Sequence, residues 1–264
     1  MDPVTEFLHW ATHDRNRSPH TIARYRAVLG QLPDPLGATL ADVEAWWATR
    51  YHMAPATRQN ELACLRAFYG WATRFDHRAE DPTRRLYAPA VDNAFPRPIG
   101  RTDLQRALDA CDEREAPDLR RALALGAYGG LRVSEAASLD WADVDLDKRL
   151  LYVRGKGRKE RLAGISPRLL DEVLPAATGN VVTAGGRVYA AATLQRRVNR
   201  HLERLGIDAT FHKLRARYVT QGIADTGDIY AVARAVGWAS VETAKHYAAL
   251  SDDSLHRIAA AASR

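Results

Sequence analysis

Residues 211–247 read FHKLRARYVTQGIADTGDIYAVARAVGWASVETAKHY, a stretch whose apolar spacing and glycines predict helices at 212–224, 228–236 and 240–249. On the first helix, His212 and Arg215 are three residues apart, so their side chains project from one face with Cβ atoms about 5–6 Å apart. Tyr247 follows Trp238 by nine residues. These residue types could bind and attack a phosphodiester, because phosphoryl transfer needs a nucleophile, proton transfer and charge neutralisation.

Two further cations precede this stretch. Arg132 follows Gly129 and Gly130 at the start of an expected short helix, VSEAASL, where the helix dipole favours a bound anion. Lys156 lies in GKGRKER, the tip of a β-hairpin that the alternating sequence LYVRGKGRKERLAGI predicts. The glycines beside Lys156 would allow the backbone to approach a ligand closely.

Each of these residues also has an ordinary structural explanation when it is considered alone. Arg132 could be a surface arginine paired with Glu135, three residues later, and a basic hairpin tip is usually only solvated. Tyr247 and Trp238 could be packing aromatics on amphipathic helices, and an H-x-x-R pair alone is a weak indication of a site. Only the order and spacing of all these motifs together favour a functional site.

The chain has 264 residues, which is enough for two domains that each bury a core. Its 38 Lys and Arg exceed its 32 Asp and Glu and give a net charge of +6. This balance permits a nucleic-acid partner without requiring one. Only five of the 38 cations are lysines, so a lysine inside a chemical motif is poorly explained by composition.

Two cysteines, Cys64 and Cys111, provide neither a disulfide framework nor a metal-ligand set, and we expect both to be reduced in the core. The sequence shows no cluster of Asp, Glu or His at metal-binding spacing, so we expect no metal and no cofactor.

The start MDPVTEFLHW is not a signal peptide. No run approaches the ~18 apolar residues of a membrane helix. The sequence therefore predicts a cytoplasmic protein without a membrane partner.

A proline-rich segment divides the chain. Residues 81–100, DPTRRLYAPAVDNAFPRPIG, contain four prolines, which exclude a continuous helix and predict an extended linker. Residues 1–80 predict a four-helix domain, and residues 101–264 predict a mostly helical domain with the hairpin and a helical tail at 252–262. The predicted fold class is two-domain and mainly α, with a small β-hairpin or sheet in the second domain.

Polar side chains remain at the starts of two helices in the N-terminal domain. Such positions usually form a solvated face, but in a basic DNA-binding protein they could contact phosphates and base edges. The candidate DNA-contact residues are Thr21, Arg24, Thr57, Arg58 and Asn60 in this domain, and Lys159 and Arg161 in the hairpin.

In their order along the chain, these motifs resemble the catalytic domain of the tyrosine recombinase (phage integrase) family. GLRVSEAASLDW resembles the family's first arginine box, GKGRKERL its hairpin, HKLR its H-x-L-R box and VGWASVETAKHY its last box. Two positions depart from the common pattern. Trp238 replaces a histidine, so it can donate to a phosphate but cannot titrate, and Ala216-Arg217 stand where a second histidine is frequent. The resemblance implies a supporting acid at Glu135 and catalytic roles for Arg132, Lys156, His212, Arg215, Trp238 and Tyr247.

The resemblance implies strand cleavage without metal or ATP, in which Tyr247 attacks the phosphate and forms a 3′-phosphotyrosyl bond. His212 would accept the tyrosine proton. Arg132 and Arg215 would hold the non-bridging oxygens through their planar forks. Lys156 would protonate the departing 5′-oxygen.

The resemblance also implies a protein that is monomeric in solution and forms tetramers on two DNA duplexes. These would exchange strands through a Holliday junction at core or attachment sites. Since Met1 leads almost directly into the first helices, we expect a small form without an arm-binding domain, and we interpret the chain as a phage or mobile-element integrase. The alternative is a cellular recombinase that resolves chromosome dimers. A type IB topoisomerase or a non-catalytic DNA-binding regulator is less favoured, because all six catalytic positions are filled and the tail at 252–262 could dock on a neighbouring subunit.

Overall fold

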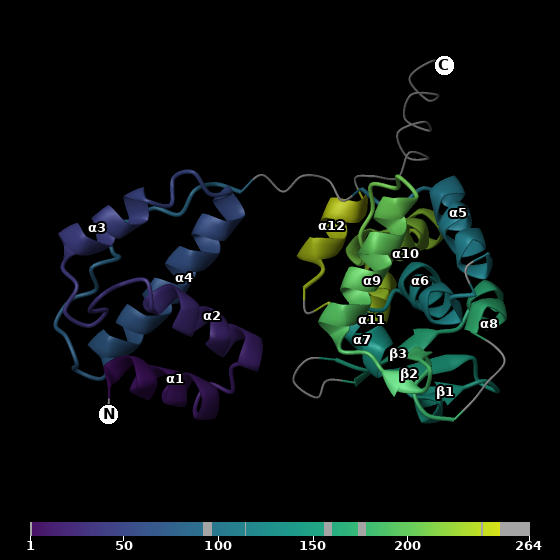
Figure 1. Cartoon of the computed structure of the whole chain (residues 1–264), viewed down its shortest axis with the longest axis horizontal. Helices are drawn as coiled ribbons and strands as arrows, with labels where there is room; N and C mark the ends of the chain where they lie inside the picture. The colour runs from purple at the N-terminus through teal and green to yellow at the C-terminus, as the bar shows by residue number, and fades with distance from the viewer. Residues whose placement is uncertain are drawn as a thin grey trace, which may run out of the picture. The chain divides into compact units, whose positions relative to one another are not determined.

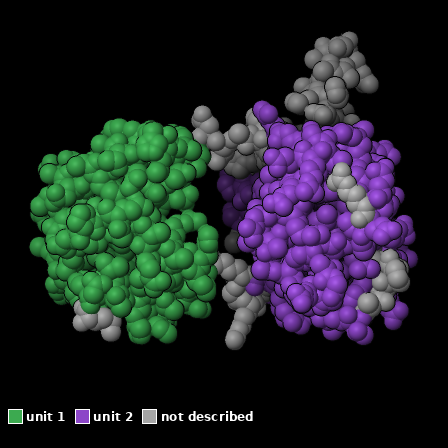
Figure 2. All heavy atoms as spheres, in the orientation of Figure 1, with its two compact units in different colours: residues 1–93 green, residues 94–264 purple. Residues whose placement is uncertain are grey.

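The computed structural model describes residues 2–91, 97–113, 115–155, 160–173, 178–238 and 240–248. The chain forms two compact units, unit 1 at residues 1–93 and unit 2 at residues 94–264 (Figure 2). The expected linker, residues 81–100, spans the boundary between them. Each unit buries its own apolar residues.

Over its described residues, unit 1 contains the four helices that the sequence predicts. They are α1 (Pro3–His13), α2 (Pro19–Leu29), α3 (Leu40–Ala48) and α4 (Pro55–Arg74) (Figure 1). The local sequence sets their starts: Asp2 accepts from the amide of Thr5 at α1, and Ser18 accepts from the amide of Thr21 at α2. Proline begins α1, α2 and α4, where its missing N–H breaks no intrahelical bond.

Unit 1 has an aromatic core between these helices. The ring of Phe7 on α1 lies 5.1 Å from the ring of Tyr25 on α2 and 5.4 Å from that of Phe68 on α4, measured between centroids. The Phe7–Phe68 pair is edge-to-face, a geometry that aromatic rings favour. Cys64 is a free, buried thiol in this core, as the sequence predicts.

The described part of unit 2 is mostly helical, with α6 packed against α5, α8 and α10. Gly126 of α6 lets α10 approach closely, since a Cβ there would lie only 3.1 Å from the Cβ of Leu214 on α10. The helices are α5 (Arg101–Asp112), α6 (Pro117–Gly129), α7 (Val133–Ser138), α8 (Pro167–Val173), α9 (Ala191–Arg204), α10 (Phe211–Thr226), α11 (Ile229–Val236) and α12 (Glu242–Ala248) (Figure 1).

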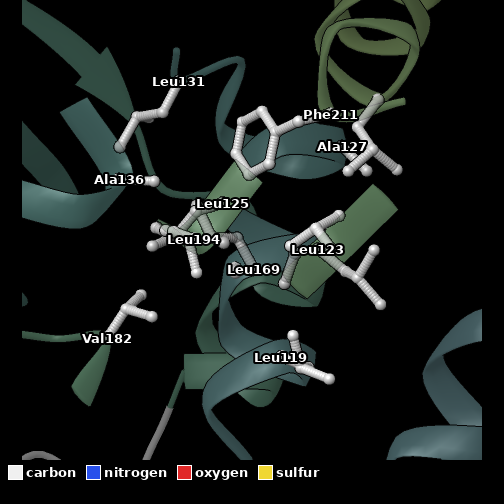
Figure 3. Packing of buried hydrophobic residues seen from close by; sticks show 14 of the residues in the cluster. Leu119, Leu123, Leu125, Ala127, Leu131, Ala136, Leu169, Val182, Leu194 and Phe211 are labelled. Carbon is white, nitrogen blue, oxygen red and sulfur yellow. The ribbon is translucent and has the colours of Figure 1, made fainter. Parts of the chain in front are cut away.

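The core of unit 2 surrounds α6. Leu123 and Leu125 of α6 are buried together with Leu194 of α9 and Phe211 of α10 (Figure 3). Cys111 of α5 belongs to the same buried cluster, in agreement with the expectation of a core thiol. This packing fixes the C-terminal end of α6 and the N-terminal end of α10. Residues of the candidate site lie at both of these helix ends.

A three-stranded antiparallel sheet with the order β1-β2-β3 lies in unit 2. It consists of β1 (Val144–Asp145), β2 (Leu150–Arg154) and β3 (Glu160–Gly164), preceded by the short 3₁₀ helix η1 (Trp141–Asp143). Strands β2 and β3 form the predicted hairpin, with Val153 opposite Arg161. The sequence did not indicate β1, nor the separate pair β4 (Thr183–Ala184) and β5 (Arg187–Val188).

The fold class is confirmed: the chain is mainly helical, with a small sheet in unit 2. The expected helices of unit 2 are present within a few residues of their predicted bounds, except the tail at 252–262, which lies outside the described residues. The hairpin tip with Lys156 and Lys159 also lies outside them. Within the described ranges, no helix is both long enough and apolar enough to span a bilayer.

Candidate active site

One buried carboxylate gathers three arginines in unit 2. Glu135 of α7 has a side chain only 2% exposed, and its two oxygens accept from Arg132 Nη1 and Arg161 Nη2, each at 2.7 Å. Arg215 Nη1 lies 3.7 Å from Glu135 Oε2. Burial alone would raise the pKa of Glu135, but the amide of Arg132 and the nearby guanidinium charges outweigh it and hold the pKa below its usual range. One ionised carboxylate therefore sets the relative positions of three guanidinium groups.

The backbone at Gly130 places Arg132 beside this carboxylate. Gly130 has a φ of +64°, and a Cβ there would lie 2.5 Å from the ring of Tyr218, so only glycine fits. The chain then enters α7 with Arg132 at the N-cap, where its amide donates to Glu135 Oε2 at 2.8 Å. The Arg132 side chain remains 43% exposed and is accessible to a ligand.

Arg215 lies on α10 three residues after His212, but unlike His212 it is almost completely buried, at 4% exposed. Its Nη1 donates to the carbonyl of Gly130 at 2.7 Å and its Nη2 to the carbonyl of Val236 at 2.6 Å. Burial lowers the pKa of Arg215 to about 10, with a further contribution from the neighbouring arginine charges. The group therefore stays charged at neutral pH in a fixed orientation.

His212 lies in the first turn of α10, on the same face as Arg215. The residue is exposed, yet partial enclosure of its ring lowers the imidazole pKa below 6.5, and the charges of Arg215 and Arg132 lower it further. The ring is consequently neutral at pH 7, the form in which a histidine can accept a proton.

Trp238 and Tyr247 lie together, although nine residues separate them. Their ring centroids are 5.3 Å apart, with the planes inclined by 33°. Tyr247 on α12 is 5% exposed and packs in a cluster with Val219 of α10 and Val236 of α11. Burial raises the pKa of the Tyr247 phenol, and Arg215 opposes this only in part. The phenol is therefore neutral and needs a base before it can act as a nucleophile.

A groove of about 1010 Å³ opens beside these residues and is lined by Arg132, Glu135, Arg161 and Trp238, among others. His212, Arg215 and Tyr247 do not line it. Arg154, Tyr230 and Arg234 are among the lining residues that the sequence did not indicate as part of a site. The side chain of Tyr230 is 70% exposed. A single exposed residue such as Tyr230 follows no local sequence pattern. Only Arg154 could have been predicted as a lining residue, because it lies next to the glycines of the hairpin.

The candidate DNA-contact residues of unit 1 lie at the starts of α2 and α4, as expected. Arg58 is held more tightly than a surface arginine, because its guanidinium carbon lies 5.2 Å from the ring of Trp47 and 5.0 Å from that of Tyr51. A DNA contact at these positions stays a prediction. The other four side chains are exposed or half-buried: Thr21, Arg24, Thr57 and Asn60.

Arg161 is placed differently from the hairpin-surface contact that we expected. Its side chain is 11% exposed, with Nη2 bound to Glu135 and Nη1 donating to the carbonyl of Ala235 at 2.7 Å. Both outer nitrogens thus bind other parts of the protein. Elsewhere in the described chain, no three His, Cys, Asp or Glu side chains are grouped closely enough to hold a metal ion.

The model of the phage integrase family matches residues 99–254, a range that includes all six candidate catalytic positions. The chain belongs to this family. It is therefore a tyrosine recombinase, an enzyme that cuts and rejoins DNA.

Similar proteins agree with this assignment. Tyrosine recombinase XerC of Rhodospirillum centenum is 32% identical over 272 residues, which cover 90% of this chain and 80% of the relative. Tyrosine recombinase XerC of Chromobacterium violaceum is 29% identical over 270 residues, covering 92% and 88%. A solved lambda integrase tetramer bound to a Holliday junction has the same fold, with a TM-score of 0.76 at 17% identity over 93% of this chain and 76% of the other.

Proposed function

We propose that this recombinase is site-specific, with Tyr247 forming a 3′-phosphotyrosyl intermediate and two duplexes exchanging strands through a Holliday junction. The observation that carries the proposal is the convergence of Arg132 and Arg215 on Glu135, next to the segment that leads to Tyr247. A guanidinium has five N–H groups, so Arg132 and Arg215 keep donors for the non-bridging oxygens of a phosphate beyond the protein bonds that orient them. Trp238, whose ring contacts Tyr247, would donate its indole N–H to the same phosphate.

Each bond change then has a residue to carry it. The phenol oxygen of Tyr247 bonds to phosphorus while the bond to the 5′-oxygen breaks. A tyrosine with a pKa of 10 is only ~0.1% ionised at pH 7, and burial raises the pKa of Tyr247, so His212 takes the proton. Lys156 gives a proton to the departing 5′-oxygen. The phosphotyrosyl bond preserves the energy of the phosphodiester, and a 5′-hydroxyl of the partner strand reverses the steps without ATP.

The proposed substrate is double-stranded DNA at core or attachment sites, bound by a tetramer on two duplexes. The solved relative is a tetramer on a Holliday junction, which supports this partner and assembly. The residues at the starts of α2 and α4 are proposed to contact the DNA. Lys159 is proposed to contact it from the hairpin.

For the biological role we propose integration by a phage or mobile element, for which the departure at Trp238 from a common histidine is the sequence argument. Resolution of chromosome dimers is a second candidate, because the relatives cited above are named XerC and match over most of their length. The two differ in the pairing of sites. A direct core repeat in the DNA flanking the gene, and recombination between two different sites, would support integration.

A nicked suicide duplex tests the chemistry. The wild-type protein should form a covalent adduct, and peptide mapping should place the DNA on Tyr247. Binding without any adduct would indicate a regulator. Relaxation of supercoiled plasmid without site preference would indicate a type IB topoisomerase. Either result would contradict site-specific recombination.

The pH profile of cleavage should report His212. Because the imidazole pKa is lowered, the neutral base predominates at a lower pH than for a free histidine. Cleavage at subsaturating DNA, whose pH dependence reports the free protein, should therefore rise with pH through a midpoint below 6.5 and then level off. His212→Gln should remove this limb of the profile. A midpoint near the raised pKa of Tyr247 would show that the phenol ionises without His212.

Lys156→Ala should slow cleavage of ordinary DNA by about 10²-fold or more, the usual contribution of a general acid. A 5′-bridging phosphorothiolate should restore most of the rate, since a thiolate leaves without a proton. Rates on both substrates are compared with wild type under single-turnover conditions. An equal loss on both would remove Lys156 from this role.

A further inference from the structure

Three arginines meet the same helix end. The last carbonyls of α11 accept no hydrogen bond from within the helix, and the helix dipole makes this end favourable for cations. Ala235 O accepts from Arg161 Nη1 at 2.7 Å, and Gly237 O accepts from Arg132 Nη2 at 3.3 Å. Val236 O accepts from Arg215 Nη2 at 2.6 Å and, more weakly, from Arg132 Nη1 at 3.5 Å. Since Trp238 follows directly, these bonds also fix where the segment towards Tyr247 begins.

Arg161 differs from the other two in what it joins. It lies on β3 opposite Val153 of β2, just after the hairpin tip that carries Lys156. From there its guanidinium binds Glu135 on α7 and Ala235 on α11 at the same time. Arg161 thus connects the hairpin, the carboxylate that orients Arg132 and the end of α11.

Gly237 leaves the space that this bridge occupies. Gly237 ends α11 with a φ of +68°, and a Cβ there would lie 2.7 Å from Arg161 Cδ and 3.0 Å from Arg161 Nε. Glycine is thus required both by the backbone conformation and by the arginine beneath it.

We propose that Arg161 is a positioning residue for strand cleavage. It acts through Glu135 and the end of α11 and does not touch the DNA. Through these contacts it fixes the position of the Arg132 guanidinium relative to Trp238. It also fixes the hairpin that carries Lys156 relative to both residues. This inference rests on the proposed function, because it assumes that Arg132 and Trp238 hold the reacting phosphate. A displacement of about 1 Å at such a centre can cost ~10²-fold in rate.

A pair of glycine variants isolates the contact with Arg161. Gly227 ends α10 with the same φ of +68°, but a Cβ there would meet no atom within 4 Å. Gly237→Ala and Gly227→Ala therefore impose the same backbone strain, and only the first displaces Arg161. Gly237→Ala should lower single-turnover cleavage at saturating DNA by about 10–100-fold, with the Kd for DNA within about twofold. Equal rates for the two variants would overturn the proposal.

A double-mutant cycle tests whether Arg161 acts through Glu135. Arg161→Gln should slow cleavage in the wild-type background but add little in Glu135→Gln, because the orienting carboxylate is already lost. Arg161→Lys should recover part of the rate, since an ammonium can bind Glu135 but cannot reach Ala235 as a planar fork. Strictly additive losses, or no recovery by lysine, would mean a general structural role.

The matched control is Arg120→Gln. Arg120 also binds a buried carboxylate, Glu172, with Nε–Oε2 at 2.6 Å. Arg120→Gln should be destabilised about as much as Arg161→Gln and still cleave at the wild-type rate.

If Arg161→Gln does not fold, Arg161→Lys and Gly237→Ala carry the test. Wild-type protein that forms no covalent adduct would defeat the proposed function itself, whereas wild-type rates in the Arg161 variants would defeat only this inference.

Discussion

Tyr247→Phe should abolish covalent capture of DNA while leaving the Kd for the site nearly unchanged. The phenylalanine ring can keep both the 5.3 Å contact with Trp238 and its place in the buried cluster of α10, α11 and α12. Only the hydroxyl that attacks phosphorus is lost, and the arginines that hold the phosphate stay in place. Removal of a nucleophile typically costs on the order of 10⁴–10⁶ in rate. The measurement is adduct formation on a suicide duplex, with binding followed separately by gel shift.

Tyr218→Phe is the control for this result. Tyr218 is another enclosed tyrosine whose pKa burial raises, and Arg161 and Arg215 lie near it as well. Its ring fills the space above Gly130, so phenylalanine preserves the packing and removes only a hydroxyl. Tyr218→Phe should still form adducts. Adducts with Tyr247→Phe, or their loss in Tyr218→Phe, would point to a different nucleophile.

The sequence predicted those features that depend on neighbouring residues. The four helices of unit 1 begin at residues such as Asp2 and Ser18, which cap α1 and α2, and Gly130 ends α6 in a left-handed conformation that glycine adopts readily. These outcomes follow from backbone chemistry within a few residues. The two-residue strands β1, β4 and β5 escaped prediction because so short a segment has no measurable alternation.

The candidate site was predictable only in part, for the same reason. The spacing of His212 and Arg215 correctly placed both on one helix, and the pair Arg132–Glu135 was visible three residues apart. Nothing in the sequence indicated that Arg161 would bind the same carboxylate, 26 residues away from it, or that it would reach the end of α11. These contacts depend on how helices and strands pack in space. The sequence pattern alone therefore predicted Arg161 to be a surface cation.

Arg215→Ala should reduce cleavage by about 10³-fold or more, the range found when a transition-state arginine is removed from phosphoryl-transfer enzymes. Arg215 is a buried guanidinium held by the carbonyls of Gly130 and Val236, so it needs no reorganisation when charge develops on the phosphate. Alanine would also leave both carbonyls without this donor, at about 1–3 kcal/mol each. We therefore expect a lower melting temperature as well, by about 2–4 °C for each kcal/mol lost.

Arg215→Lys separates charge from geometry. Lysine keeps the positive charge near Glu135, but its single ammonium cannot replace a planar fork that donates to both Gly130 and Val236. Cleavage should stay at least about 10²-fold below wild type although much of the stability returns. Arg217→Lys is the matched control on the same helix, because Arg217 donates one bond, to the carbonyl of Ile99 at 3.3 Å. If Arg215→Lys cleaved at the rate of Arg217→Lys, charge alone would suffice, and the oriented guanidinium fork would not be what holds the phosphate.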